Sequence, residues 1–419
     1  MPRSLSSIGS VPRERREPFA LWNLGFRPFY LLASIFAAVS ILLWIATYAG
    51  VLPGGYLRDP VWHAHEMLFG YTIAVITGFL FTAGRNWTGQ PTPTGALLAA
   101  YAALWIAGRI VVLLPYPVAA AVVNAAFPIA AAAGLAVPLV RSRNRRNYFF
   151  VALLVMLGVV TLAIHLAHAG YFAWPARAGL QVALDVVLFI IAVMAGRVVP
   201  MFTNNAIRGA GAARNPLVEK AAQGGVLLLV VADLLPLDPT WLGVLALLVA
   251  IAHAARLLLW RPWRTLATPL VWVLHAAYAW VVVYLVLRAL SAWGIIAPPL
   301  AIHALTIGVI GGMTIGMMTR TARGHSGRPL TADRYEVAAY VLVQAAALVR
   351  VFGGIALPSF YLDTVVASGL CWSAGFALYA VRYWPILTRP RTRSSKPSVS
   401  IFTSMRLAES AARASSSVT

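Results

Sequence analysis

Twelve separate apolar stretches run through this 419-residue chain. Each is about 20 residues long, which lets an α-helix cross roughly 30 Å of hydrocarbon. The stretches lack the alternating pattern of the strands in an outer-membrane β-barrel. With 60% hydrophobic and 11% charged residues, the composition also lies far outside the range of soluble domains. We therefore expect an all-α integral membrane protein with about twelve transmembrane helices.

The apolar pattern predicts three parts along the chain. A segment over 1–27 precedes a twelve-helix transmembrane domain over 28–384, and a basic tail over 385–419 follows it. Because the tail is rich in Arg, Ser and Thr and has little apolar periodicity, we expect it to be disordered or to form a surface segment drawn to anionic lipid. The helices are expected at 28–49, 61–83, 95–114, 117–140, 148–170, 178–202, 217–236, 239–260, 267–289, 295–319, 334–355 and 362–384.

The net charge of +21 comes from arginines that lie mostly in alternate connections between these spans. This distribution favours a role in membrane topology over nucleic-acid binding. Because cytoplasmic loops carry the excess of Lys and Arg, it predicts that both termini are cytoplasmic. The connections on the outer side hold only Arg58, Arg109, Arg177, Arg288 and Arg350.

Five of the eight histidines fall near the outer ends of their spans: His63, His65, His165, His168 and His303. Ionisable side chains within a bilayer are rare and usually functional. Neutral imidazole is a common ligand of haem iron and copper. The pattern therefore indicates metal or haem ligation. His253 and His275 lie nearer the inner ends of adjacent spans and could face each other in a second, inner site.

An internal echo selects the expected haem ligands. A shift of 238 residues superposes His65 on His303 and Gly70 on Gly308, in the second and tenth spans. The two histidines differ in depth by only about 4–5 Å, which allows bis-histidine ligation of haem b. The end of the sixth span shows a related echo, so the second, sixth and tenth spans share the pattern. Because these spans are four apart in the chain, three arcs of four helices are possible.

The remaining outer histidines are candidate copper ligands. Residues two apart on a helix point about 200° apart, so His63 and His65 cannot face one metal from a regular helix. His63 is left to reach a second metal or a water network. His165 and His168, three residues apart, share a helix face and could chelate one ion. Imidazole suits both copper and zinc.

Two acidic residues within apolar spans are the candidates for proton or orienting roles. Glu66 directly follows His65, so it could orient an imidazole or deliver protons, and it is the candidate catalytic residue. Asp185 could partner His165 or His168. A carboxylate in a membrane span usually either pairs with a basic residue or relays protons.

The chain resembles the NnrS family of bacterial membrane proteins. The motifs that carry the resemblance are Gly25-Phe26-Arg27-Pro28-Phe29, Trp62 to Met67, Asn86-Trp87-Thr88-Gly89, Gly196 to Asn205 and His303 to Pro329. The resemblance implies a twelve-helix inner-membrane protein that contains haem and copper and is linked to denitrification and nitrosative stress. It also invites comparison with haem-copper oxidases, whose twelve helices form three arcs. This chain lacks their histidine on the sixth span and their adjacent histidine pair on the seventh.

Three functions remain open at this stage. The leading hypothesis is a haem- and copper-binding protein that handles nitric oxide or another small apolar ligand arriving through the lipid bilayer. Whether it converts, senses or merely binds nitric oxide is open, as is its redox partner. The second is a proton-coupled secondary transporter that uses Glu66, Asp185 and the histidines. The third is an assembly partner of a denitrification reductase.

Overall fold

The computed structural model describes residues 19–52, 56–57 and 59–392, and within this part of the chain no strand occurs. All twelve expected spans are helical, so the all-α prediction is confirmed. The helical segments are α1 (Phe26–Tyr48), α2 (Asp59–His65), η2 (Glu66–Thr72), α3 (Ile73–Thr88), α4 (Gly95–Val111), α5 (Pro117–Arg141), α6 (Tyr148–His168), α7 (Ala176–Ala206), α8 (Pro216–Leu234), α9 (Pro239–Leu259), α10 (Pro269–Ala292), α11 (Pro298–His303), η5 (Ala304–Gly311), α12 (Gly312–His325), α13 (Arg334–Leu348), η6 (Val349–Gly353), α14 (Gly354–Ala356) and α15 (Tyr361–Thr388).

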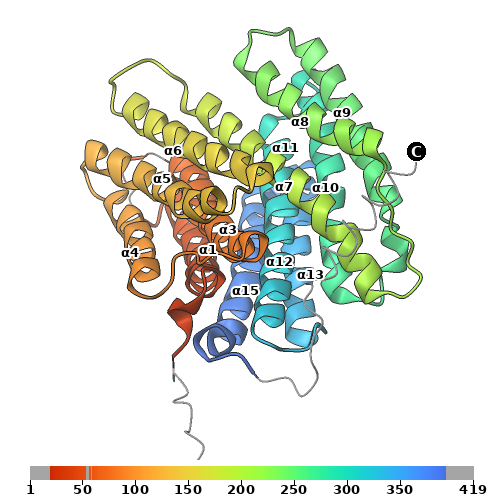
Figure 1. Cartoon of the computed structure of the whole chain (residues 1–419). Coiled ribbons are helices and arrows are strands. Elements are labelled where there is room, and N and C mark those ends of the chain that lie inside the picture. The colour runs from red at the N-terminus through yellow and green to blue at the C-terminus, as the bar shows by residue number, and fades with distance from the viewer. Residues whose placement is uncertain (1–18, 53–55, 58, 393–419) are drawn as a thin grey trace, which may run out of the picture.

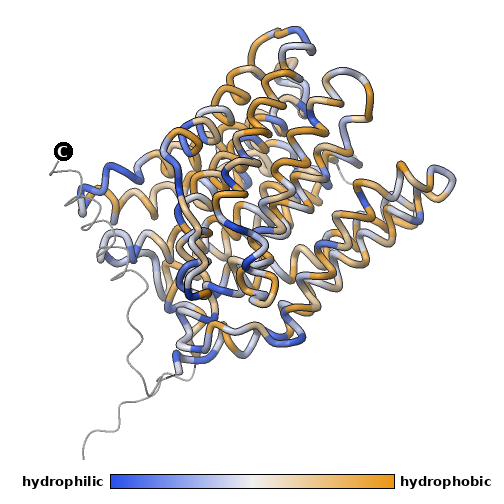
Figure 2. The backbone as a smooth tube through the Cα atoms, turned by 90° about the vertical axis from the view of Figure 1, so that its right-hand side faces the viewer, coloured by the Kyte–Doolittle hydropathy of each residue, from blue (hydrophilic) through white to orange (hydrophobic). Residues whose placement is uncertain are grey.

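Length and composition make this a multi-pass membrane protein. Among the described residues, ten helices are long and apolar enough to cross a membrane. The other two spans are α4, which is apolar but has 17 residues, and α8, which carries Glu219, Lys220 and Asp233. Figure 2 shows hydrophobic residues along most of the helices and hydrophilic residues gathered mainly in the connections.

The first and last spans lie side by side, with α1 packed along α15 (Figure 1). The most enclosed spans are 60–88 and 176–206, in which 89% and 78% of an 18-residue apolar stretch is buried. The spans 269–292 and 298–325 follow, at 67% each. The second, sixth and tenth spans, which share the internal echo, are thus among the most enclosed helices.

The two ends of the domain contact each other. The Ala20 amide donates a hydrogen bond to the Thr388 carbonyl oxygen over 2.7 Å, and the Thr392 amide bonds to the Ser326 carbonyl oxygen over 3.0 Å. Helix α15 runs to Thr388, so the last helix extends past the expected domain end at 384. The rest of the predicted tail, from 393, and the predicted N-terminal segment up to 18 lie outside the described residues.

Three of the spans contain π-helical segments toward the same end of the bundle. The segment η2 begins directly after His65, and η5 begins directly after His303. The third, η6, contains Arg350. Wider π turns are rare and occur frequently at functional sites. We call this end, which carries His63, His65, His165, His168 and His303, the histidine face, and the other end the opposite face.

Candidate metal centre

The closest pair of histidines joins α2 to α6. The Nε2 atoms of His65 and His165 lie 2.9 Å apart, and both side chains are fully buried. Each ring also has a partner at its other nitrogen. The Nδ1 of His65 lies 2.8 Å from Oε1 of Glu66, and the Nδ1 of His165 bonds to the Tyr56 hydroxyl. Two imidazoles therefore point their free edges at one location.

The hydrogen-bond partners of His65 and His165 determine which nitrogen of each ring carries the proton when no ion lies between the rings. A carboxylate only accepts, so His65 donates its Nδ1–H to Glu66 and presents a lone pair at Nε2. His165 then donates its Nε2–H to His65 and accepts the Tyr56 hydroxyl proton at Nδ1. The chain of hydrogen bonds thus runs from Tyr56 to Glu66 in one direction.

Glu66 is held by an arginine from α4. Arg109 donates to Oε1 of Glu66 over 2.6 Å, and its other terminal nitrogen bonds to the Asn124 side chain. Gly70 makes this approach possible, since a Cβ there would lie 2.5 Å from Nη1 of Arg109. The sequence pattern predicts Arg109 in an outer connection, but its side chain is largely enclosed and anchors the candidate catalytic carboxylate.

Tyr56, which the sequence analysis missed, joins the two histidines of α6. Its hydroxyl bonds to His165, and its carbonyl oxygen lies 2.9 Å from Nε2 of His168. His165 and His168 therefore do share a face. Burial and the nearby Glu66 carboxylate raise the pKa of Tyr56, so its hydroxyl stays protonated. Only its position in the loop before α2 gives it this role, and no motif marks it.

A second histidine pair joins α2 to α11. The rings of His63 and His303 have centroids 6.5 Å apart and planes 16° from parallel. Trp44 lies against His63, with centroids 4.9 Å apart and an 18° angle. The Nδ1–H of His303 donates to the Pro299 carbonyl oxygen over 2.6 Å, which leaves its Nε2 lone pair available. Arg350 is an electrostatic neighbour of both rings.

The histidines therefore meet in two pairs that differ from the expected one. His65 faces His165, and His303 faces His63; within the described chain no contact joins His65 to His303. The same residues contain no group of three or more His, Cys, Asp or Glu side chains that could hold a metal ion. Each candidate site thus offers two imidazoles.

Asp185 lies apart from the histidines that it was expected to partner. Its Oδ1 accepts hydrogen bonds from Arg288 over 2.9 Å and from Gln181 over 3.1 Å. Arg288 also bonds to Asp233. Asp185 therefore belongs to an ion cluster that links α7, α8 and α10.

The two inner histidines do not form a site with each other. His253 lies 2.7 Å from the Tyr278 hydroxyl and 3.1 Å from the Ala222 carbonyl oxygen, so both of its ring nitrogens have protein partners. His275 instead lies 3.0 Å from the Val271 carbonyl oxygen. The contacts of His253 give it a structural role.

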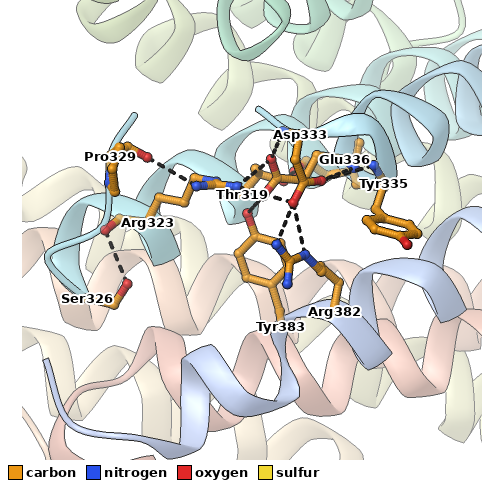
Figure 3. Close-up of polar contacts among 10 residues, drawn as sticks. Thr319, Arg323, Ser326, Pro329, Asp333, Tyr335, Glu336, Arg382 and Tyr383 are labelled. Carbon is orange, nitrogen blue, oxygen red and sulfur yellow. Dashed lines mark hydrogen bonds and ion pairs between the residues drawn. The ribbon is translucent and has the colours of Figure 1, made fainter. Parts of the chain in front are cut away.

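The buried carboxylates share one feature. In the described part of the chain, every buried acidic side chain accepts a hydrogen bond from an arginine. The pairs are Glu66 with Arg109, Asp185 with Arg288, Glu219 with Arg256, and Glu336 with Arg323, the last of which is drawn in Figure 3. Each pair joins two different helices, so these carboxylates link neighbouring parts of the bundle.

A known family covers most of the chain. The family described as NnrS protein matches residues 20–391. The chain belongs to the NnrS family. Comparison with curated proteins gave no match. Membership in NnrS confirms the resemblance inferred from the motifs and supports, at the level of the family, a nitric-oxide-related membrane protein.

Proposed function

We propose that this NnrS protein binds haem and copper at its histidine face and acts on nitric oxide as part of nitric oxide metabolism or resistance to nitrosative stress. It would reside in a bacterial inner membrane with both termini cytoplasmic, as the arginine distribution predicts. One observation carries the proposal. Four histidines from three separate spans meet in two pairs at the same end of the bundle.

The pair of His65 and His165 fits copper. Both Nε2 atoms are directed at one point, and imidazole nitrogen is a ligand that copper favours. A metal-bound histidine usually donates its other N–H to a carboxylate or carbonyl group, as His65 does to Glu66. In this site Glu66 is a positioning residue, because it acts on the metal only through the imidazole. His168 lies beside the pair through its contact with Tyr56.

His63 and His303 would hold the haem. Their ring centroids lie 6.5 Å apart, and neutral imidazole is a common ligand of haem iron. His303 keeps its predicted role as a haem ligand, and His63 replaces His65. The Pro299 carbonyl oxygen orients His303 through Nδ1.

Bound haem iron and copper would supply a binding site for nitric oxide and exchange electrons. The chain's own residues fix the surroundings. Arg109 holds Glu66, Glu66 fixes the orientation of His65, and Tyr56 fixes that of His165. Nitric oxide is small and apolar, so it can arrive through the lipid bilayer.

The buried ion pairs weigh against a proton-coupled transporter. Such a transporter needs a carboxylate that gains and loses a proton during each cycle. The buried carboxylates of the described chain are instead tied to arginines by ion pairs that join different helices, which gives them a structural role. The metal-binding proposal is therefore the better account of the polar residues.

The function is tested by the visible spectrum of the purified protein with and without nitric oxide. We expect a Soret band that shifts when nitric oxide is added, and we expect its loss in His63→Gln/His303→Gln. The matched control is His325→Gln, which removes a histidine at the opposite face. A wild-type protein without a Soret band, or a band unchanged in the double variant, would contradict the haem assignment.

Replacement of the orienting carboxylate should weaken the copper site without removing a ligand. In Glu66→Gln the charged acceptor for the Nδ1–H of His65 is lost, and such changes typically cost about 10–100-fold in metal affinity. Competition with a copper chelator measures the affinity. An affinity equal to that of the wild type would show that Glu66 does not support the site.

A further inference from the structure

Several motifs that the metal centre does not use meet at the opposite face. Arg27 begins α1, Arg85 ends α3, Arg328 follows α12, and Arg389 and Arg391 follow α15. Electrostatic neighbours of Arg328 include Arg27 and Arg389. Arg27, Arg85 and Arg391 also share the half-buried ring of His325 as a neighbour. We call these five arginines the arginine cluster.

Hydrogen bonds to the backbone tie together the segments that carry Arg27, Arg328 and Arg389. Nη1 of Arg27 donates to the carbonyl oxygens of Leu387 and Arg389, over 2.8 Å each. The Thr392 hydroxyl donates to the Gly327 carbonyl oxygen over 3.0 Å. Gly327 has a φ of +75°, and a Cβ there would lie 2.4 Å from the Thr392 carbonyl oxygen. The site is therefore built by backbone contacts that only glycine permits at this point.

The cluster lacks the carboxylates that neutralise its neighbours. Arg323 bonds to Glu336 over 2.7 and 2.8 Å, and Arg382 bonds to Asp333 over 2.5 Å (Figure 3). Among the described residues, no ion pair joins a member of the arginine cluster to an acidic side chain.

One donor of the cluster is buried and has no protein acceptor. Nη1 of Arg328 makes no hydrogen bond although it is shielded from solvent. Burial and the positive charges of Arg323, Arg389 and Arg382 lower the pKa of Arg328. A buried donor without a partner is costly, so an anion that accepts from it would stabilise this arrangement.

We propose that the arginine cluster binds a phosphate group, from the headgroup of an anionic phospholipid or from a soluble phosphate. Guanidinium groups match phosphate oxygens in geometry and charge. Basic pockets between transmembrane helices on the cytoplasmic side bind such headgroups. Topology alone does not account for Arg27, because topological arginines can stay in solvent, as Arg85, Arg389 and Arg391 do, whereas Arg27 is only 4% exposed.

The test compares two variants of the purified full-length protein in neutral detergent. Arg85→Gln/Arg328→Gln removes two cluster charges but keeps Arg27, which holds the end of α15. Arg208→Gln/Arg264→Gln removes two exposed arginines from connections at the same face and is the control with equal charge. Affinity is measured by titration with inorganic phosphate and, separately, with phosphatidylglycerol against phosphatidylcholine.

Hydrogen bonds to charged groups are among the strongest in proteins, so we expect the cluster variant to bind at least about tenfold more weakly. The control variant should bind like the wild type. Binding of inorganic phosphate would identify a soluble phosphate as the ligand. Binding of phosphatidylglycerol alone would identify a lipid headgroup as the ligand. The proposal fails if neither probe binds the wild type, or if the two variants bind equally.

Discussion

His65→Gln/His165→Gln is expected to remain folded and to lose essentially all of its bound copper. The Nε2 atoms of His65 and His165 lie 2.9 Å apart and are the closest pair of candidate ligand nitrogens at the histidine face. Their removal leaves Glu66 and Tyr56 without the imidazoles that they orient. Copper per chain is measured by elemental analysis of the purified protein, and helical content by circular dichroism.

The matched control for this variant is His63→Gln/His303→Gln, which removes two imidazoles from the neighbouring pair. It should keep its copper. If both double variants lose copper equally, the four histidines act as one site. If neither loses copper, the metal is bound elsewhere.

Arg256→Met is expected to destabilise the protein by about 3–5 kcal/mol, because it removes the buried partner of the Glu219 carboxylate and leaves only the half-exposed Arg214, 3.3 Å away, as a counter-charge. Arg256 is fully buried and donates to the two Glu219 oxygens over 2.9 and 2.5 Å. It also donates to the Ala192 carbonyl oxygen over 2.7 Å. Gly196 makes room for it, since a Cβ there would lie 1.7 Å from Nη2 of Arg256. Equilibrium unfolding in detergent micelles measures the loss.

The double variant Arg256→Met/Glu219→Leu separates the cost of an unpaired charge from that of lost packing. Replacing both partners of a buried ion pair with apolar residues is often neutral. We therefore expect the double variant to recover most of the stability lost in the single variant. A single variant as stable as the wild type would mean that water reaches Glu219.

The sequence predicted the helices well because each apolar stretch is as long as a membrane span. It did not predict the π-helical segments that begin after His65 and His303. These wider turns change the direction in which the following side chains point. Nor did it place the end of α15, because the helix continues past the apolar stretch to Thr388.

The candidate site was predicted in part. The grouping of five histidines near one end followed from their positions along the spans, and the shared face of His165 and His168 followed from helix geometry. The pairing of His65 with His303 did not form, because depth along two helices does not fix which sides of those helices face each other. Tyr56 was missed because loop conformation brings it to His165.

The arginines show the same limit. Hydropathy assigned Arg109 and Arg288 to connections between spans, where charged residues normally lie. In the structure each reaches back to a buried carboxylate, Glu66 or Asp185, on a helix distant in sequence. Such pairs cannot be identified from one sequence, because their members are 43 and 103 residues apart.

The central claim, that two histidine pairs hold two different metals, is tested most directly by the iron and copper content of the wild type and of both double histidine variants. We expect the wild type to contain both metals. His65→Gln/His165→Gln should retain iron and lose copper, and His63→Gln/His303→Gln should retain copper and lose iron. A wild-type protein without either metal, or two variants with unchanged metal content, would contradict the claim.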